Sequence, residues 1–213
     1  MVTRNAESMG NYGAAWESGG YCGSGNVADL IGQLRYRSAV ICGNAEGVFD
    51  ELADASGKLH DPVIFAVNDV GMFLPKVDHW VSLHADNIGT WKQVRWMHAR
   101  EQEATKYHSV DPRPVVNYVW QGLTPLFALS GYFAMQIAYI MGAELIVLCG
   151  CPGESKRRFF EHASRADFGY GSGSANSDSG VRIQLLKEME RLPQFAERVR
   201  SMSGFTQEFF GGM

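Results

Sequence analysis

The sequence lacks the features that mark several large protein classes. The formal net charge is −4, so the chain has no global basic field of the kind that nucleic-acid-binding domains carry. No apolar run approaches the roughly 20 residues that a membrane-spanning helix needs. The first twenty residues are polar and rich in glycine, unlike a secretory signal peptide. The sequence therefore predicts a cytoplasmic protein without a membrane span.

Cysteine is scarce as well. The four cysteines are Cys22, Cys42, Cys149 and Cys151, and the last two form a C-x-C pair rather than the C-x-x-C of redox and zinc sites. Cys42 and Cys149 fall inside apolar runs, where a free thiol behaves as a small hydrophobe. This pattern favours a reduced protein, and no loop acids have a spacing that specifies a metal, so we predict no metal site.

Two regions have no periodic pattern. Residues 1–35 are dense in glycine, which favours a flexible arm that a second subunit of a homo-oligomer could order. The alternative is a lid or substrate loop carrying aromatic residues. Residues 151–180 form a second irregular region, and a long loop inside a compact domain is usually functional or disordered. We assign residues 1–35 to an arm and residues 36–213 to a single nucleotide-binding domain.

Short apolar segments typical of buried strands recur between helical patterns. The expected strands are residues 39–42, 63–67, 80–83, 115–119, 145–148 and 199–202. The expected helices are residues 48–55, 90–103 and 180–191, with a strongly apolar helix that begins at Ser130 and stops at Gly142. This alternation predicts an α/β fold, a doubly wound, mostly parallel, Rossmann-like sheet of about six strands.

In such sheets, ligands bind beyond the carboxyl ends of the strands. Polar residues follow four predicted strands, and we expect them to converge: Gly43 and Asn44, Asn68 and Asp69, His84 to Asp86, and residues 149–154. The start of the apolar helix should join them, with Ser130 as N-cap and the free amides of Ser130 and Gly131 as a phosphate site. Asparagine side chains offer both a donor and an acceptor to a base or ribose edge.

His84 and Asp86 are the candidate catalytic pair. Two residues apart on an extended strand end, they would point the same way and tune a general base, or hold a divalent cation with a nucleotide's phosphates. The alternative is that they only cap the strand. His162 is a second candidate base. Arg157 and Arg158 could clamp a phosphate, or could simply be a solvated charge run.

The strand-end motifs Cys42-Gly43-Asn44, Val67-Asn68 and Ser130-Gly131, with residues 138–150, resemble a known group. They are similar to those of the Rossmann-type bacterial sialyltransferases of lipooligosaccharide synthesis and the related motility-accessory-factor glycosyltransferases. The resemblance implies a nucleotide-sugar donor and an acceptor that it does not identify. It also implies that Gly43, Asn44 and Asn68 contact the nucleotide, and that Ser130 and Gly131 contact its phosphate or sugar.

Three positions depart from the family pattern. Ala45-Glu46 replaces a Gly-Pro pair, Leu129 replaces a Thr, and His162 lacks the glycine that precedes the family's general-base histidine. Three interpretations therefore stay open. The first is a small glycosyltransferase. The second is a pterin-type pyrophosphokinase that would use magnesium, ATP, Asp69 and Asp86. The third is a catalytically inactive Rossmann-like module that binds a partner.

Overall fold

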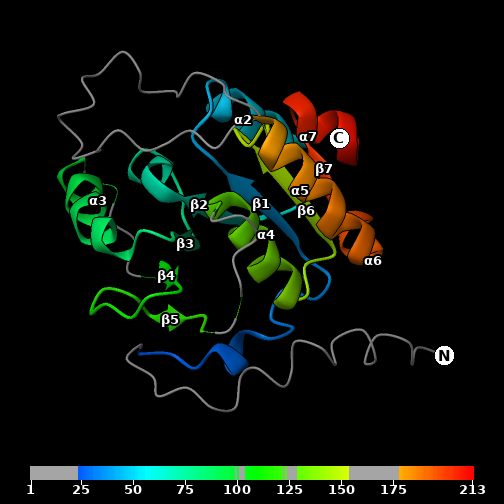
Figure 1. The fold of residues 1–213 in the computed structure, drawn as a ribbon. Coiled ribbons are helices and arrows are strands. Elements are labelled where there is room, and N and C mark those ends of the chain that lie inside the picture. Colours follow the sequence, from blue (N-terminus) through cyan, green and yellow to red (C-terminus); the bar gives the residue numbers. More distant parts are fainter. Residues whose placement is uncertain (1–23, 99, 101–103, 122, 124–128, 154–177) are drawn as a thin grey trace.

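One parallel sheet runs through the centre of the protein (Figure 1). The structure is a computed structural model that describes residues 24–98, 100, 104–121, 123, 129–153 and 178–213. Within these residues the sheet has seven strands in the order β5-β4-β3-β2-β1-β6-β7, and all neighbours are parallel. The strands are β1 (Ser38–Cys42), β2 (Val63–Val67), β3 (His79–Val81), β4 (Lys106–Ser109), β5 (Tyr118–Val119), β6 (Leu145–Cys149) and β7 (Val199–Ser201). The predicted α/β, parallel, Rossmann-like architecture is confirmed.

The strand count differs from the prediction of about six, because β4 has no apolar pattern. Its sequence is Lys-Tyr-His-Ser, yet the last three of these residues are buried. The predicted strand at residues 115–119 shrinks to its last two residues, which form the edge strand β5. A polar segment can lie inside a sheet when its side chains find hydrogen-bond partners there, and periodicity does not report such partners.

Helices cover both faces of the sheet. One face is covered by α2 (Val48–Lys58), α3 (Ala85–Met97) and the 3₁₀ helix η2 (Asn68–Met72). The other face, toward the viewer in Figure 1, is covered by α4 (Ser130–Ile140), α5 (Asp178–Arg191), α6 (Pro193–Ala196) and the 3₁₀ helix η1 (Val27–Leu30). The last helix, α7 (Gly204–Phe210), packs beside β7. Among the helices that the structure describes, none combines the length and the apolar character needed to cross a membrane.

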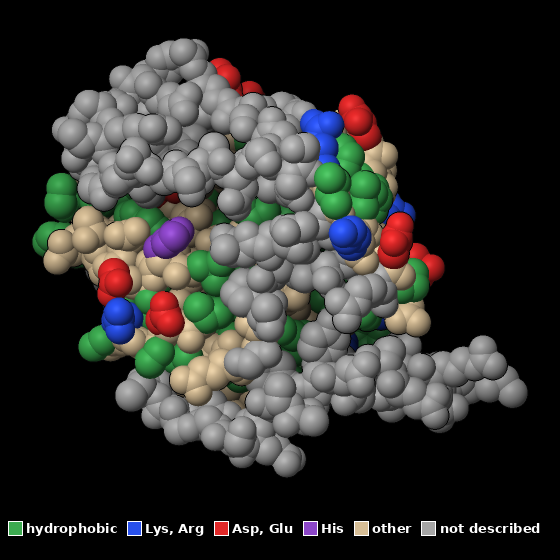
Figure 2. Space-filling model, viewed as in Figure 1, with side chains coloured by type: hydrophobic (Ala, Val, Ile, Leu, Met, Phe, Trp, Pro, Cys, Tyr) green, Lys and Arg blue, Asp and Glu red, His purple; other side chains and the backbone are tan. Residues whose placement is uncertain are grey.

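The described surface on the side of α4 and α5 carries no gathering of basic side chains (Figure 2). Hydrophobic and uncharged side chains alternate there with scattered Lys, Arg, Asp and Glu.

Residues 1–23 of the predicted arm lie outside the described residues. Residues 24–35 include η1, whose Val27 and Leu30 are buried in the core together with Leu34.

The apolar helix α4 is buried almost all round and ends as predicted. Gly142 adopts a φ of 90°, and its amide donates to the carbonyl of Tyr139 at 2.9 Å. The amide of Ala143 donates to the carbonyl of Ala138 at 3.0 Å. These two bonds form a Schellman cap, which requires the left-handed conformation that glycine adopts most easily. The glycine therefore fixes where α4 turns into β6.

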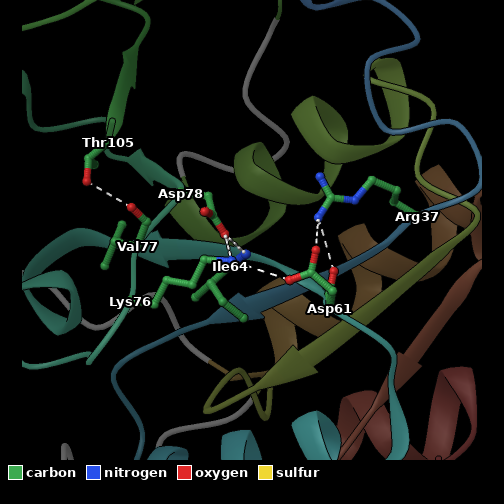
Figure 3. A network of polar contacts seen from close by, with 7 residues as sticks. All are labelled: Arg37, Asp61, Ile64, Lys76, Val77, Asp78 and Thr105. Atoms are coloured by element: carbon green, nitrogen blue, oxygen red, sulfur yellow. Dashed lines mark hydrogen bonds and ion pairs between the residues drawn. The ribbon is translucent and has the colours of Figure 1, made fainter. Parts of the chain in front are cut away.

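The amino-terminal edge of the sheet is tied together by exposed charges (Figure 3). Asp61, before β2, accepts a hydrogen bond from Arg37, before β1, at 2.9 Å, and lies 3.8 Å from the ammonium group of Lys76. Asp78, before β3, pairs with Lys76 at 3.2 Å and accepts from the amide of Ile64 at 2.8 Å. Exposed pairs of this kind each contribute little stability, roughly 0–1 kcal/mol, but they align the strand entries.

The carboxyl ends of β1 and β6 approach each other closely through two glycines. The amide of Gly43 donates to the carbonyl of Cys149 at 2.8 Å, and a Cβ on Gly43 would overlap the carbonyl oxygen of Gly150 and the thiol of Cys151. Gly150 has a φ of 62°, and a Cβ there would lie 2.7 Å from the Cβ of Val48. The chain leaves β1 toward β2 and leaves β6 toward β7, so this contact marks the topological switch point of the sheet.

A buried polar chain joins β3, β4 and the residue after β5. The indole N–H of Trp120 donates to Nδ1 of His108 at 3.0 Å, and Nε2 of His108 lies 2.9 Å from Nδ1 of His79. Because Nδ1 of His108 is an acceptor, the neutral ring carries its proton on Nε2 and donates it to His79. Burial, with the charge of Lys106 next, lowers the pKa of His79 to about 3. Burial, with His79 next, lowers the pKa of His108 well below its usual range.

This series of buried hydrogen bonds predicts that the free energy of unfolding falls as the pH is lowered. Unfolding restores the ordinary pKa of 6.5, so below that pH the unfolded state binds more protons than the native state, and stability is lost as the pH falls. For His79 alone the loss is about 2 kcal/mol between pH 7.5 and pH 5, and it levels off near pH 3. Urea unfolding at several pH values measures it. His108→Gln should flatten the pH dependence of the free energy of unfolding, and a slope equal to that of the wild type contradicts the assignment.

The contact of Gly43 with Gly150 predicts that replacing Gly43 by alanine destabilises the protein, whereas alanine at an uncrowded glycine does not. Gly43→Ala should lower the free energy of unfolding by about 1–3 kcal/mol, because the new methyl group must displace backbone at the switch point. Gly57, inside α2, has nothing within 4 Å of an added Cβ. Gly57→Ala should therefore raise the free energy of unfolding by about 0.5–1 kcal/mol through helix propensity. Denaturant unfolding of both variants checks this, and a neutral Gly43→Ala would contradict the close contact.

Candidate functional site

Two asparagines follow β1 and β2 at neighbouring places beyond the sheet. Cys42 of β1 pairs with Ala66 of β2, so Asn44 and Asn68 each stand two residues past paired positions. Nδ2 of Asn44 donates to the carboxylate of Asp69, whose side chain is fully buried. Oδ1 of Asn44 is also shielded from water, and it has no partner among the residues that the structure describes. An unpaired buried acceptor costs roughly 1–3 kcal/mol, which a ligand donor would recover.

Asn68 is held in a left-handed conformation by its neighbours. Its φ is 56°, a region that asparagine enters more readily than most residues. Its carbonyl accepts from the indole N–H of Trp80 at 2.6 Å, and its side-chain Oδ1 accepts from the hydroxyl of Ser82 at 2.8 Å. Within the described residues, Nδ2 of Asn68 makes no hydrogen bond and can donate to a ligand.

The start of α4 reaches the end of β3. The hydroxyl of Ser130 accepts a hydrogen bond from the amide of Leu83 at 3.2 Å. The prediction that Ser130 is the N-cap of its own helix is therefore wrong, because the side chain serves this tertiary contact. Leu129 is the N-cap residue, and the first bond of α4 runs from the amide of Phe133 to its carbonyl at 3.1 Å. The amides of Ser130 and Gly131 precede that bond, and no acidic side chain lies in the first turn. This helix start is suited to an anion.

Gly131 has no packing reason to be glycine among the described residues. An added Cβ would lie 3.7 Å from Sγ of Cys151, an ordinary contact, in contrast to the overlap at Gly43. Burial, with Glu51 next, raises the pKa of Cys151 to about 12, so its thiol stays protonated and is a wall of the site rather than a nucleophile. The absence of a side chain at residue 131 leaves space beside the helix start.

The predicted catalytic pair is arranged differently from the expectation. His84 is the N-cap residue of α3 and Asp86 lies in its first turn, so the two are not on an extended strand end and do not share a face. His84 is exposed, and its amide donates to the hydroxyl of Ser82 at 2.9 Å. Asp86 is exposed and accepts from Nε of Arg113 at 2.5 Å, which lowers the pKa of its carboxyl. Only His84 adjoins the contact of Leu83 with Ser130.

The remaining candidates divide into two groups. His162, Arg157 and Arg158 lie outside the described residues. In the part of the chain that is described, no group of three or more His, Cys, Asp or Glu side chains could hold a metal ion. Asp69 and Asp86, the pair that a pyrophosphokinase would need together, have different partners: Asp69 is buried against Asn44, and Asp86 is exposed against Arg113.

The structure also brings in two residues that sequence reasoning did not assign to the site. Ser82 falls inside the predicted strand at residues 80–83, but β3 ends one residue earlier and its hydroxyl contacts Asn68. Trp80 reaches the carbonyl of Asn68 from within β3. The only signal in the sequence is a small polar residue in an apolar strand, which by itself does not distinguish a strand end from its interior.

Comparison with known proteins supports the fold independently. No protein-family model matches the sequence, and no curated protein matches it. Among solved structures, the chain is similar to the monofunctional alpha-2,3-sialyltransferase Cst-I from Campylobacter jejuni, with a TM-score of 0.57 and 14% sequence identity. The match covers 83% of this chain and 80% of Cst-I. The fold of this protein is therefore similar to that of a bacterial sialyltransferase, the group that its strand-end motifs resemble.

Proposed function

We propose that this protein is a glycosyltransferase that binds a nucleotide sugar at the carboxyl edge of its sheet. The observation that supports the proposal is the series of contacts that links the two asparagines, beyond β1 and β2, to the start of α4. Asn44 reaches Asp69, and the residue before Asp69 is Asn68; the end of β3 then links Asn68 to Ser130 through Ser82 and Leu83. These contacts supply neutral amide groups for a nucleoside and backbone amides for a phosphate.

The nucleoside would lie against Asn44 and Asn68. Both side chains have hydrogen-bonding atoms that described neighbours leave unused, Oδ1 of Asn44 and Nδ2 of Asn68. A nucleoside edge offers donors and acceptors that match them. Gly43 permits the close approach of β1 and β6 beneath this position, so its role is to shape the floor of the site.

The phosphate would lie at the start of α4. The amides of Ser130 and Gly131 and the dipole of an eleven-residue helix stabilise negative charge there. Charge grows on the phosphate as its bond to the sugar breaks, so donors already in place lower the barrier to transfer. Among the described side chains visible in Figure 2, Lys and Arg are scattered rather than gathered in a cluster. Arg157 and Arg158 remain candidates for a clamp over the same phosphate.

The acceptor hydroxyl needs a base, and His84 is the best placed of the described candidates. It is exposed one residue beyond Leu83, whose amide contacts Ser130 at the start of α4. An imidazole in its neutral form can accept the hydroxyl proton as the new glycosidic bond forms. Asp86 is engaged by Arg113 and is not assigned this role. His162 remains an alternative base.

The similarity to the sialyltransferase Cst-I supports this proposal at the level of the fold and is compatible with sugar transfer as the reaction class. A fold alone does not carry a reaction, so the site residues carry the argument. The pyrophosphokinase interpretation loses its main support, since Asp69 and Asp86 are not held together. An inactive binding module remains the outcome that a nucleotide-binding experiment must exclude.

The proposed function predicts a selective thermal shift. The purified chain should be stabilised by at least one of CMP, UDP, GDP and CMP-sialic acid, because a ligand that binds only the folded state raises its stability. ATP with magnesium and S-adenosylmethionine serve as comparison ligands, and EDTA tests for a divalent cation. A folded protein with no shift for any nucleotide contradicts the proposal and favours an inactive module.

A further prediction tests whether Gly131 is needed to leave room for a ligand or only for packing at the start of α4. Gly131→Ala should keep or slightly raise the melting temperature of the free protein, since alanine is the better helix former and its methyl group has room beside Cys151. It should nevertheless weaken nucleotide binding about tenfold or more, because the methyl group occupies the approach of the phosphate. Titration calorimetry measures the nucleotide affinity of this variant and of the control Gly57→Ala, which alters a glycine in α2. Equal affinity in both variants contradicts a phosphate position beside Gly131.

A further inference from the structure

We propose that Asp69 and Ser82 are positioning residues that fix the side-chain amides of Asn44 and Asn68 in opposite orientations. The site would then select a ligand that carries a hydrogen-bond donor next to a hydrogen-bond acceptor. The inference rests on the proposed function and deepens it. Asn44 would present an acceptor and Asn68 a donor. An asparagine without a fixed partner can turn its amide by half a rotation and accept either pattern, so these two contacts would determine specificity.

The orientation of Asn44 follows from charge. Asp69 is fully buried, and its carboxylate accepts from Nδ2 of Asn44. A half turn of the Asn44 amide would place Oδ1 against the carboxylate, two acceptors in a site shielded from water. The contact therefore keeps Oδ1 on the other side, where it is buried and has no partner within the described residues.

The orientation of Asn68 follows from the single proton of the Ser82 hydroxyl. Ser82 is fully buried, and its oxygen accepts from the amide of His84 at 2.9 Å. Its proton then needs an acceptor, and Oδ1 of Asn68 at 2.8 Å provides one. The indole N–H of Trp80 holds the Asn68 carbonyl at 2.6 Å and fixes the backbone beneath the side chain. Nδ2 of Asn68 consequently faces away from Ser82 as a donor.

The two oriented amides lie side by side in the sheet order, since β1 and β2 are neighbours and the asparagines stand at equivalent distances past their paired ends. A ligand that satisfies both must offer a donor to Asn44 and an acceptor to Asn68. A nucleoside has two edges of this kind. One is the exocyclic amine and ring nitrogen of cytosine, and the other is the vicinal diol of ribose. Uracil reverses the order at the corresponding edge of the base.

The experiment measures selectivity rather than affinity alone. Titration calorimetry compares CMP, UMP and 2′-deoxy-CMP on the wild-type chain, Ser82→Ala, Ser82→Thr and Asp69→Asn. The wild type should prefer CMP over UMP if the base is read, or over 2′-deoxy-CMP if the ribose is read, by about 3- to 10-fold per fixed hydrogen bond. Ser82→Ala and Asp69→Asn should bring that ratio toward one, because each frees an amide to turn. Ser82→Thr keeps the hydroxyl and should keep the ratio.

Ser201→Ala is the matched control, since it removes another buried serine hydroxyl at the end of β7. A general loss of stability would lower affinity for every nucleotide together and leave the ratio unchanged. The inference is overturned if Ser82→Ala and Asp69→Asn keep the wild-type ratio, or if the wild type binds nucleotides without any preference. Failure of the wild type to bind any nucleotide overturns the proposed function itself, and the inference with it.

Discussion

The close approach of β1 and β6 at Gly43 and Gly150 is the constraint on which the rest of the site depends. Their backbones come within a distance that admits no Cβ, and the chain departs from the two strands in opposite directions. This geometry places the turn after β1 directly beside the turn after β6. It also lets α4, which feeds β6, bring its first turn next to Cys151. Asn44, two residues past β1, reaches Asp69, two residues past β2.

The side chains proposed to contact the ligand are mostly neutral, although the carboxylate of Glu51 lies nearby and accepts a hydrogen bond from the amide of Gly150 at 2.6 Å. Asp69, the buried carboxylate among these residues, is hydrogen-bonded to Asn44. The charged pair of Asp86 with Arg113 lies on the exposed first turn of α3. Neutral amides and a helix start gain much of their strength from exclusion of water, and they lose little to salt screening. Such a site would select ligands by hydrogen-bond pattern more than by net charge.

Much of this arrangement could be predicted from the sequence, because it depends on local signals. Apolar runs gave β1, β2 and β6, and Gly142 marked the end of α4. The strand-end residues were placed at one edge by topology alone. The strand β4 could not be found in this way, since His108 is buried only because Trp120 and His79 satisfy its ring nitrogens. That pairing joins residues distant in sequence, and no local pattern encodes it.

The same limit applies to the chemistry of the site. The family resemblance predicts Asn68 as a ligand contact, but the orientation of its side chain depends on Ser82, just after β3, and its backbone is held by Trp80 of β3. Ser130 was expected to cap its helix and instead ties α4 to β3 through Leu83. In each case a side chain that sequence rules assign to a local role is used across strands. Local sequence patterns therefore predict the backbone at this edge of the sheet, whereas the contacts that orient its side chains join residues that are distant in sequence.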